Sequence, residues 1–131
     1  MSIEPKVVNR FASNLNKLVY DKCAKDMAVQ DIDMFITYYK VPGKPQVIIE
    51  EKQSNEKITA QQWFNLPRWE SERGIPYVII RKHSDNSYTI ERCAKQYQTT
   101  YVIAFLTEDQ LVNHINDYFL LKSLIDANPQ S

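Results

Sequence analysis

Glycine is scarce in this chain of 131 residues, which has only 2, and none forms a Gly-rich phosphate loop of the nucleotide-binding type. No apolar run approaches the ~20 residues needed to cross a bilayer, and residues 1–6 lack the apolar stretch of a secretory signal. The cysteines, Cys23 and Cys93, are too few for a disulfide framework, which favours reduced thiols in the cytosol. We therefore expect a cytoplasmic protein without a membrane span.

Net charge is also lacking, because 16 Lys and Arg residues balance 16 Asp and Glu residues. This balance excludes a histone-like or tail-driven polyanion binder. The charge is nevertheless uneven, with +3 over residues 1–25 and −3 over residues 105–131. A basic side can still dock a phosphate backbone, and accidental asymmetry of a solvated surface is an equally good explanation.

The composition is that of an ordinary globular domain, with 44% hydrophobic and 24% charged residues, and we expect one domain over residues 1–131. Hydrophobic periodicity predicts, in chain order, a helix over 5–25, strands over 31–39 and 46–53, a helix over 59–74, strands over 76–81, 88–93 and 101–106, and a helix from 107 to about 125. This order predicts a mixed sheet of about five strands flanked by helices, in the α/β or α+β class.

The predicted helix over 59–74 has clear ends. Thr59, followed three residues later by Gln62, fits a capping box, and Gly74 is typical of a helix C-cap. Trp63 is expected to face the core. Pro67 lies inside this segment and is expected to kink the helix or split it in two.

The strongest chemical signal lies at the end of the strand over 46–53, where the apolar residues 47–49 run directly into Glu50, Glu51 and Lys52. Side chains alternate along a strand, so Glu50 and Lys52 share one face and Glu51 points to the other. The hairpin predicted from the two strands would bring an aspartate near the start of the first strand, Asp31 or Asp33, to the same edge of the sheet.

Two carboxylates at one edge repel each other unless a cation lies between them. Mg²⁺ prefers oxygen ligands and is typically held by one or two carboxylates together with water and substrate phosphate. A nearby lysine can orient or deprotonate the attacking water, and its charge favours phosphate. Carboxylates, a lysine and a metal ion together are suited to phosphodiester hydrolysis.

Asp33, followed after 17 residues by Glu50-Glu51-Lys52, resembles the motif of the PD-(D/E)xK nuclease superfamily. The surrounding order of a helix, a hairpin with the motif on its second strand, a further helix and a strand is similar as well. This resemblance covers about residues 5–81 and implies a restriction-endonuclease-like core. Small members of the superfamily include Holliday-junction resolvases and restriction-type or repair endonucleases.

The resemblance implies a role for each motif residue. Asp33 and Glu50 would bind Mg²⁺ or Mn²⁺, and the backbone carbonyl of Glu51 would be a further ligand. Lys52 would act on the nucleophilic water. Gln62 would support the site or contact DNA.

Three positions leave alternatives open. Gln61 competes with Gln62 for the role of the supporting glutamine. The family often has a Pro before the Asp, but Ile32 stands there, so Asp31 competes with Asp33. Many members also carry a Glu in the first helix, and Glu4, just ahead of the predicted helix, is the only acidic residue before Asp21.

Each candidate also has a purely structural interpretation. Glu50, Glu51 and Lys52 can form a solvated strand end, and Gln62 can be a capping residue alone. The tryptophans at 63 and 69 can stack on bases, but core packing is the stronger expectation. A Tyr pair at 38 and 39 can form an exposed patch suited to a dimer contact or to nucleic acid. A basic cluster can track a phosphate backbone or end a polar hairpin; its members are Arg81, Lys82, His83, Arg92 and Lys95.

From these features we predict a small metal-dependent endonuclease that hydrolyses phosphodiester bonds in DNA, with Mg²⁺ or Mn²⁺ as its cofactor. A short chain with one site and no separate DNA-binding domain is expected to act as a symmetric homodimer. An alternative is a non-catalytic protein of the same fold that binds DNA or inhibits a protein, since fold does not fix function. A nuclease directed at RNA is a third possibility.

Overall fold

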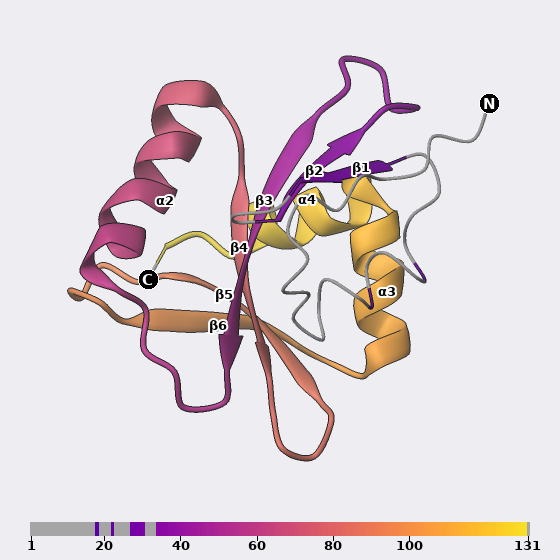
Figure 1. Ribbon diagram of the computed structural model, residues 1–131. Helices are drawn as coiled ribbons and strands as arrows, with labels where there is room; N and C mark the ends of the chain where they lie inside the picture. Colours follow the sequence, from indigo (N-terminus) through magenta and orange to yellow (C-terminus); the bar gives the residue numbers. More distant parts are fainter. Residues whose placement is uncertain (1–17, 19–21, 23–26, 31–33, 131) are drawn as a thin grey trace.

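A computed structural model describes residues 18, 22, 27–30 and 34–130 of the chain (Figure 1). Leu18 and Lys22 are helical, and the remainder of the helix expected over residues 5–25 lies outside the described residues. Three of the acidic candidates also lie outside them, namely Glu4, Asp31 and Asp33.

The centre of the protein is a mixed sheet of six strands, which stand in the sheet in their order along the chain. The strands are β1 (Met27–Gln30), β2 (Phe35–Tyr38), β3 (Gln46–Gln53), β4 (Tyr77–Lys82), β5 (Tyr88–Cys93) and β6 (Thr100–Leu106). Only β3 and β4 pair in parallel, and every other neighbouring pair is antiparallel.

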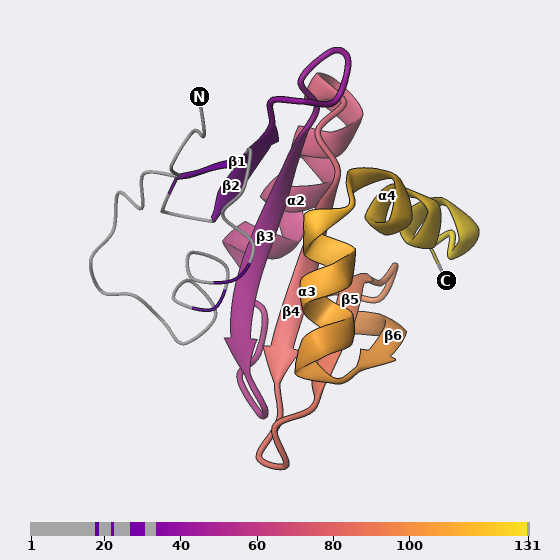
Figure 2. The same cartoon turned by 90° about the vertical axis from the view of Figure 1, so that its right-hand side faces the viewer.

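Helices cover both faces of the sheet. The helix α2 (Ala60–Arg73) connects the parallel strands β3 and β4, while α3 (Glu108–Asn116) and α4 (Tyr118–Ala127) follow β6. Figure 2 shows α3 and α4 in front of the sheet and α2 behind it. The predicted class, α+β with a mixed sheet between helices, is confirmed.

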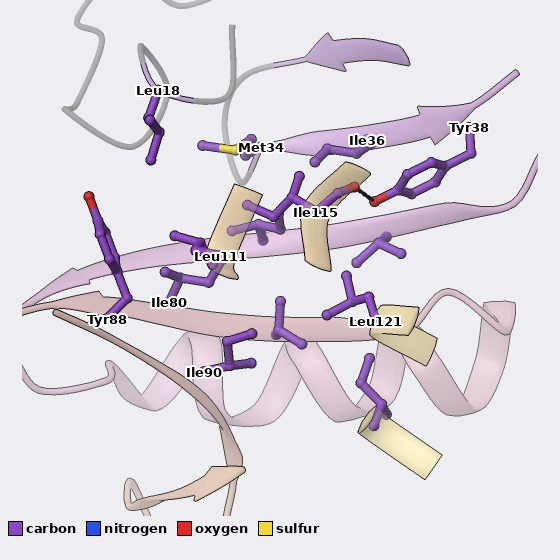
Figure 3. Close-up of a cluster of buried hydrophobic side chains, with 14 residues drawn as sticks. Leu18, Met34, Ile36, Tyr38, Ile80, Tyr88, Ile90, Leu111, Ile115 and Leu121 are labelled. Carbon is purple, nitrogen blue, oxygen red and sulfur yellow. Dashed lines mark hydrogen bonds between the residues drawn. The ribbon is translucent and has the colours of Figure 1, made fainter. Parts of the chain in front are cut away.

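Two apolar clusters correspond to the two faces. The face under α3 and α4 has the larger one, built on residues such as Ile36, Ile80, Leu111 and Ile115 (Figure 3). The face under α2 has a smaller one, made of Ile48, Ile58, Leu66, Tyr77, Ile79 and Cys93, with both tryptophans packed against it. The core packing expected for the tryptophans is therefore confirmed.

The Tyr pair is divided between core and surface. Tyr38 is buried, and its hydroxyl donates a hydrogen bond to the backbone carbonyl of Ile115 at 2.5 Å (Figure 3). Tyr39 is 36% exposed. An exposed patch made by both tyrosines is thus wrong, because alternation along β2 sends Tyr38 to the face under α3.

The capping residues of α2 are confirmed, since Thr59 and Gln62 form a reciprocal capping box and Gly74 adopts a left-handed φ of 68°. Pro67 does not split this helix, which continues from Ala60 to Arg73. The residues around Pro67 pack on the sheet, with Leu66 buried, and this packing holds the helix together where one backbone hydrogen bond is missing.

Other boundaries differ from expectation. The single helix expected from residue 107 to about 125 is two helices, because Asp117 ends α3 and its side chain accepts a hydrogen bond from Leu120 N–H at the start of α4. The strand expected over 31–39 is shorter, as β2 spans Phe35–Tyr38, and β1 is an additional strand. The described part of the chain has no helix that is long and apolar enough to span a membrane.

Candidate functional site

Glu50 and Lys52 lie on the face of β3 that α2 covers, the face that Ile48 also occupies. Glu50 is 9% exposed and Lys52 only 3% exposed, whereas the next residue, Gln53, is exposed. The solvated strand end is therefore the wrong interpretation for this pair. Burying charged groups is costly unless they are paired or hydrogen bonded, so their partners define the site.

Glu51 points to the opposite face, as the alternation predicts. Ile49, two residues earlier on the same face of β3, belongs to the cluster under α3, and so does Tyr88. Burial, followed by the negative charges of Glu108 and Glu51, raises the pKa of the Tyr88 hydroxyl. The Glu51 carboxylate is thus separated by the sheet from Glu50 and Lys52.

Gln62 connects the start of α2 to the carboxylate of Glu50. Its Nε2 donates a hydrogen bond to Glu50 Oε1 at 2.5 Å, and its Oε1 accepts one from the backbone N–H of Thr59 at 3.1 Å. The capping interpretation of Gln62 is confirmed, and the same side chain also contacts Glu50, because the amide has a donor and an acceptor end. Gln61 is exposed.

Lys52 has a partner in the loop after β3. Its Nζ lies 3.3 Å from Oε2 of Glu56, whose side chain is 48% exposed. The backbone N–H of Gln53 and the charge of Lys52 hold the pKa of the Glu56 carboxyl below its usual value, against a smaller opposing effect of burial. Lys52 is enclosed rather than solvated, because α2 and this loop cover the end of β3.

A second ion pair lies beside Lys52. It involves Arg81 on β4, which stands opposite Lys52 in the parallel pairing of β3 with β4. Arg81 Nε donates to Glu91 Oε2 on β5 at 2.9 Å, and Nη1 donates to the backbone carbonyls of Gln53 at 2.8 Å and Glu56 at 2.5 Å. Arg81 therefore fixes the loop that carries the partner of Lys52.

Glu91 is the most extensively bonded carboxylate of this face. Besides Arg81, it accepts hydrogen bonds from the hydroxyls of Thr89 and Thr100, both at 2.6 Å. Burial raises the pKa of Glu91, but the hydrogen bonds from Arg81, Thr100 and Thr89 outweigh it and hold the pKa below its usual value. Sequence reasoning named Arg81 only as part of a basic cluster and missed Glu91, Thr89 and Thr100.

The predicted basic cluster does not form one surface. Arg81 is paired with Glu91, and Arg92 is buried, with Nη2 donating to Glu70 Oε2 at 2.6 Å and its guanidinium 4.4 Å from the ring centroid of Tyr77. Neither arginine is thus an exposed cation suited to tracking a phosphate backbone.

Within the described residues, no three or more His, Cys, Asp or Glu side chains come together to hold a metal ion. Glu50 supplies one carboxylate, and the chemistry of Mg²⁺ requires only one or two of them beside water and phosphate. Asp33 is outside the described residues. Met34 follows Asp33 in the chain, and its carbonyl accepts a hydrogen bond from the N–H of Ile49 at 3.1 Å. Ile49 directly precedes Glu50.

Comparison with protein-family models, with curated proteins and with solved structures found no match for this chain. Function must therefore be argued from the residues themselves.

Proposed function

We propose that this protein is a metal-dependent nuclease that hydrolyses phosphodiester bonds in DNA. The single observation that carries the proposal is the burial of Glu50 and Lys52 on one face of β3 beside the start of α2, where Glu50 is bonded by Gln62 and Lys52 by Glu56. A buried carboxylate and a buried lysine two residues apart are unusual in a protein core, and functional sites are where such groups concentrate.

The strand order supports the resemblance to PD-(D/E)xK nucleases. The acid-x-Lys triplet lies on the second strand of an antiparallel hairpin, and the chain then crosses through α2 to a strand parallel to β3. Gln62 lies in the first turn of that helix, and its amide contacts Glu50. This is the arrangement that the resemblance implies.

In this proposal, Asp33 and Glu50 hold Mg²⁺ or Mn²⁺, with the backbone carbonyl of Glu51 as a further ligand. A bound divalent cation lowers the pKa of a coordinated water and stabilises charge on a phosphate. The hydrogen bond from Gln62 fixes the rotamer of Glu50, so Gln62 is a positioning residue.

Lys52 orients the attacking water and favours the phosphate through its positive charge. Its buried aliphatic stem limits the positions open to Nζ, and Glu56 holds that group on the loop side. In hydrolysis the water oxygen forms a bond to phosphorus, and the bond between phosphorus and the oxygen of the departing nucleotide breaks.

The same proposal includes a homodimer in the cytoplasm. One site cuts one strand, so a symmetric pair of sites provides a simple means of cutting a duplex or a junction. The scarcity of cysteine agrees with a reducing compartment.

A second candidate function is a binding module that keeps this arrangement without catalysis, and RNA is a possible target in place of DNA. The observation that favours a non-catalytic protein is the burial of Lys52, whose Nζ is already bonded to Glu56.

A cleavage assay tests the proposal and separates these candidates. Linear, supercoiled, single-stranded and four-way-junction DNA, and a single-stranded RNA, are incubated with the protein and Mg²⁺, Mn²⁺ or EDTA. We expect metal-dependent cleavage of DNA that Glu50→Gln and Lys52→Met lose. Lys122→Met is the matched control, because Lys122 on α4 pairs with Asp126 far from the site in sequence. Absence of cleavage by a folded protein on every substrate contradicts the proposal and favours the binding module.

A further inference from the structure

Three aromatic rings gather beside the proposed site and form what we call the aromatic platform, which consists of Trp63, Phe64 and Tyr97. The ring centroids of Trp63 lie 5.2 Å from those of Phe64 and 5.1 Å from those of Tyr97, and the rings of Phe64 and Tyr97 are 6.2 Å apart. Phe64 is 59% exposed and Tyr97 is 52% exposed. A contiguous cluster of exposed aromatic side chains, unlike a single exposed ring, indicates a binding surface.

The platform is held close to Gln62 by hydrogen bonds. Trp63 follows Gln62 directly, and its indole Nε1 donates to the backbone carbonyl of Ala94 at 3.1 Å. Gln98 Nε2 donates to the carbonyl of Ile58 at 3.3 Å. These two bonds join the turn between β5 and β6, which carries Tyr97, to the start of α2, so the rings are positioned before any ligand arrives.

A groove of about 530 Å³ extends from the platform to the loop that holds the partner of Lys52. Its lining is mixed, with the polar residues Glu56, Lys57, Arg81 and Thr100 beside Ile58 and Tyr97. The groove therefore has aromatic surface at one end and, at the other, Glu56, which bonds Lys52.

We propose that the aromatic platform stacks an unpaired base, so that the substrate of the proposed nuclease is single-stranded or locally unpaired DNA. Stacking on aromatic rings is available only to bases that have left a duplex, and it tolerates every base because each has a π-face. The groove suits the backbone that such a base carries, because the exposed cation Lys57 lines it. This inference rests on the proposed function for the identity of its ligand.

Binding is measured in EDTA, which stops cleavage, by the fluorescence anisotropy of labelled oligothymidylate, of the same length of oligouridylate, and of a blunt duplex. We expect the wild-type protein to prefer oligothymidylate to the duplex. Phe64→Ala and Tyr97→Ala should each weaken that binding about tenfold while leaving duplex binding unchanged. Phe105→Ala is the matched control, because Phe105 on β6 is 79% exposed and lies outside the platform.

Equal affinity for single strand and duplex, or wild-type affinity in both platform variants, would overturn the inference. The absence of binding to any oligonucleotide would overturn it as well. A preference for oligouridylate over oligothymidylate would show that the ligand is RNA rather than DNA. The two proposals fail separately. If Phe64→Ala binds oligothymidylate as wild type does and still cleaves duplex DNA, the role of the aromatic platform is wrong and the nuclease proposal stands. If single-strand binding depends on Phe64 but no cleavage occurs in Mg²⁺ or Mn²⁺, the nuclease proposal is wrong and the role of the aromatic platform stands.

Discussion

The amide of Gln62 donates a hydrogen bond to Glu50 Oε1 at 2.5 Å, and its other end accepts one from the backbone of Thr59. One side chain therefore caps α2 and fixes a carboxylate on β3. A capping residue normally acts only on its own helix. Here the cap links the stability of the helix start to the geometry of the proposed site.

Substitutions at Gln62 and Thr59 should separate these two effects. Thr59→Ala removes the side-chain cap and should lower the free energy of unfolding by about 1 kcal/mol, with little change in cleavage rate. Gln62→Ala should lower stability by a similar amount and also reduce metal-dependent cleavage, because Glu50 loses its donor. Urea unfolding and cleavage rates measured on both variants test this. Equal cleavage rates in Thr59→Ala and Gln62→Ala would show that Gln62 acts only as a cap.

Lys52 should contribute to both stability and activity, since it is only 3% exposed. Lys52→Ala leaves a cavity around the lost stem and should destabilise the protein by about 2 kcal/mol. Lys52→Met keeps most of the volume and should fold with nearly wild-type stability, yet lose cleavage by about 100-fold or more. Thermal unfolding and a cleavage time course distinguish the two variants, and wild-type cleavage by Lys52→Met would remove Lys52 from the mechanism.

Glu91 should make the protein sensitive to acid. Its pKa in the folded state is lowered, so its stabilisation is complete above the pKa of about 4.3 of an unfolded glutamate and is lost as pH falls through the lower folded-state value. Glu91→Gln should lower the free energy of unfolding by about 3 kcal/mol at neutral pH. The difference in the free energy of unfolding between Glu91→Gln and wild type should shrink as the pH falls below 4.

The control for this pH dependence is Glu72→Gln. Glu72 also pairs with an arginine, Arg68, at 2.8 Å, but both side chains are exposed. Solvent screens exposed pairs, so they contribute little to stability, and this variant should unfold almost as wild type does from pH 7 to pH 3. A pH profile of Glu91→Gln parallel to that of wild type would refute the assignment.

Pro67 should limit the stability of α2. It lies in the interior of the helix and has no N–H to donate, so the carbonyl of Trp63 lacks its helical partner. Pro67→Ala restores that donor but makes the unfolded chain more flexible, and we expect a net gain of about 1–2 kcal/mol. Thermal unfolding gives the sign directly, and a lower melting temperature would mean that the ring of Pro67 contributes packing that outweighs the missing bond.

Features set by local chemistry could be predicted from the sequence. The alternation of Glu50, Glu51 and Lys52 follows from strand geometry, and the ends of α2 follow from Thr59, Gln62 and Gly74. Each depends on residues close together in the chain. The division of the last helix was missed because no Gly or Pro stands between residues 107 and 125, and Asp117 lies next to an apolar run that continues the helical pattern.

Features made by contacts between distant segments could not be predicted. The network of Arg81, Glu91 and Thr100 depends on the register of three strands, and no single segment contains its pattern. Tyr97 joins Trp63 only because the turn between β5 and β6 reaches the start of α2. The solvated strand end is wrong for Lys52 for the same reason, since Arg81 on β4 holds the loop whose Glu56 bonds its Nζ.

The central claim is that Glu50 is a ligand of a divalent cation. Calorimetric titration of Mn²⁺ into the protein tests it without requiring a known substrate, using wild type, Glu50→Gln, Asp33→Asn and the control Asp126→Asn on α4. We predict a binding heat in wild type and in the control that is lost in Glu50→Gln and Asp33→Asn, while all four proteins unfold cooperatively. An unchanged heat in Glu50→Gln, or none in a folded wild-type protein, would contradict the account.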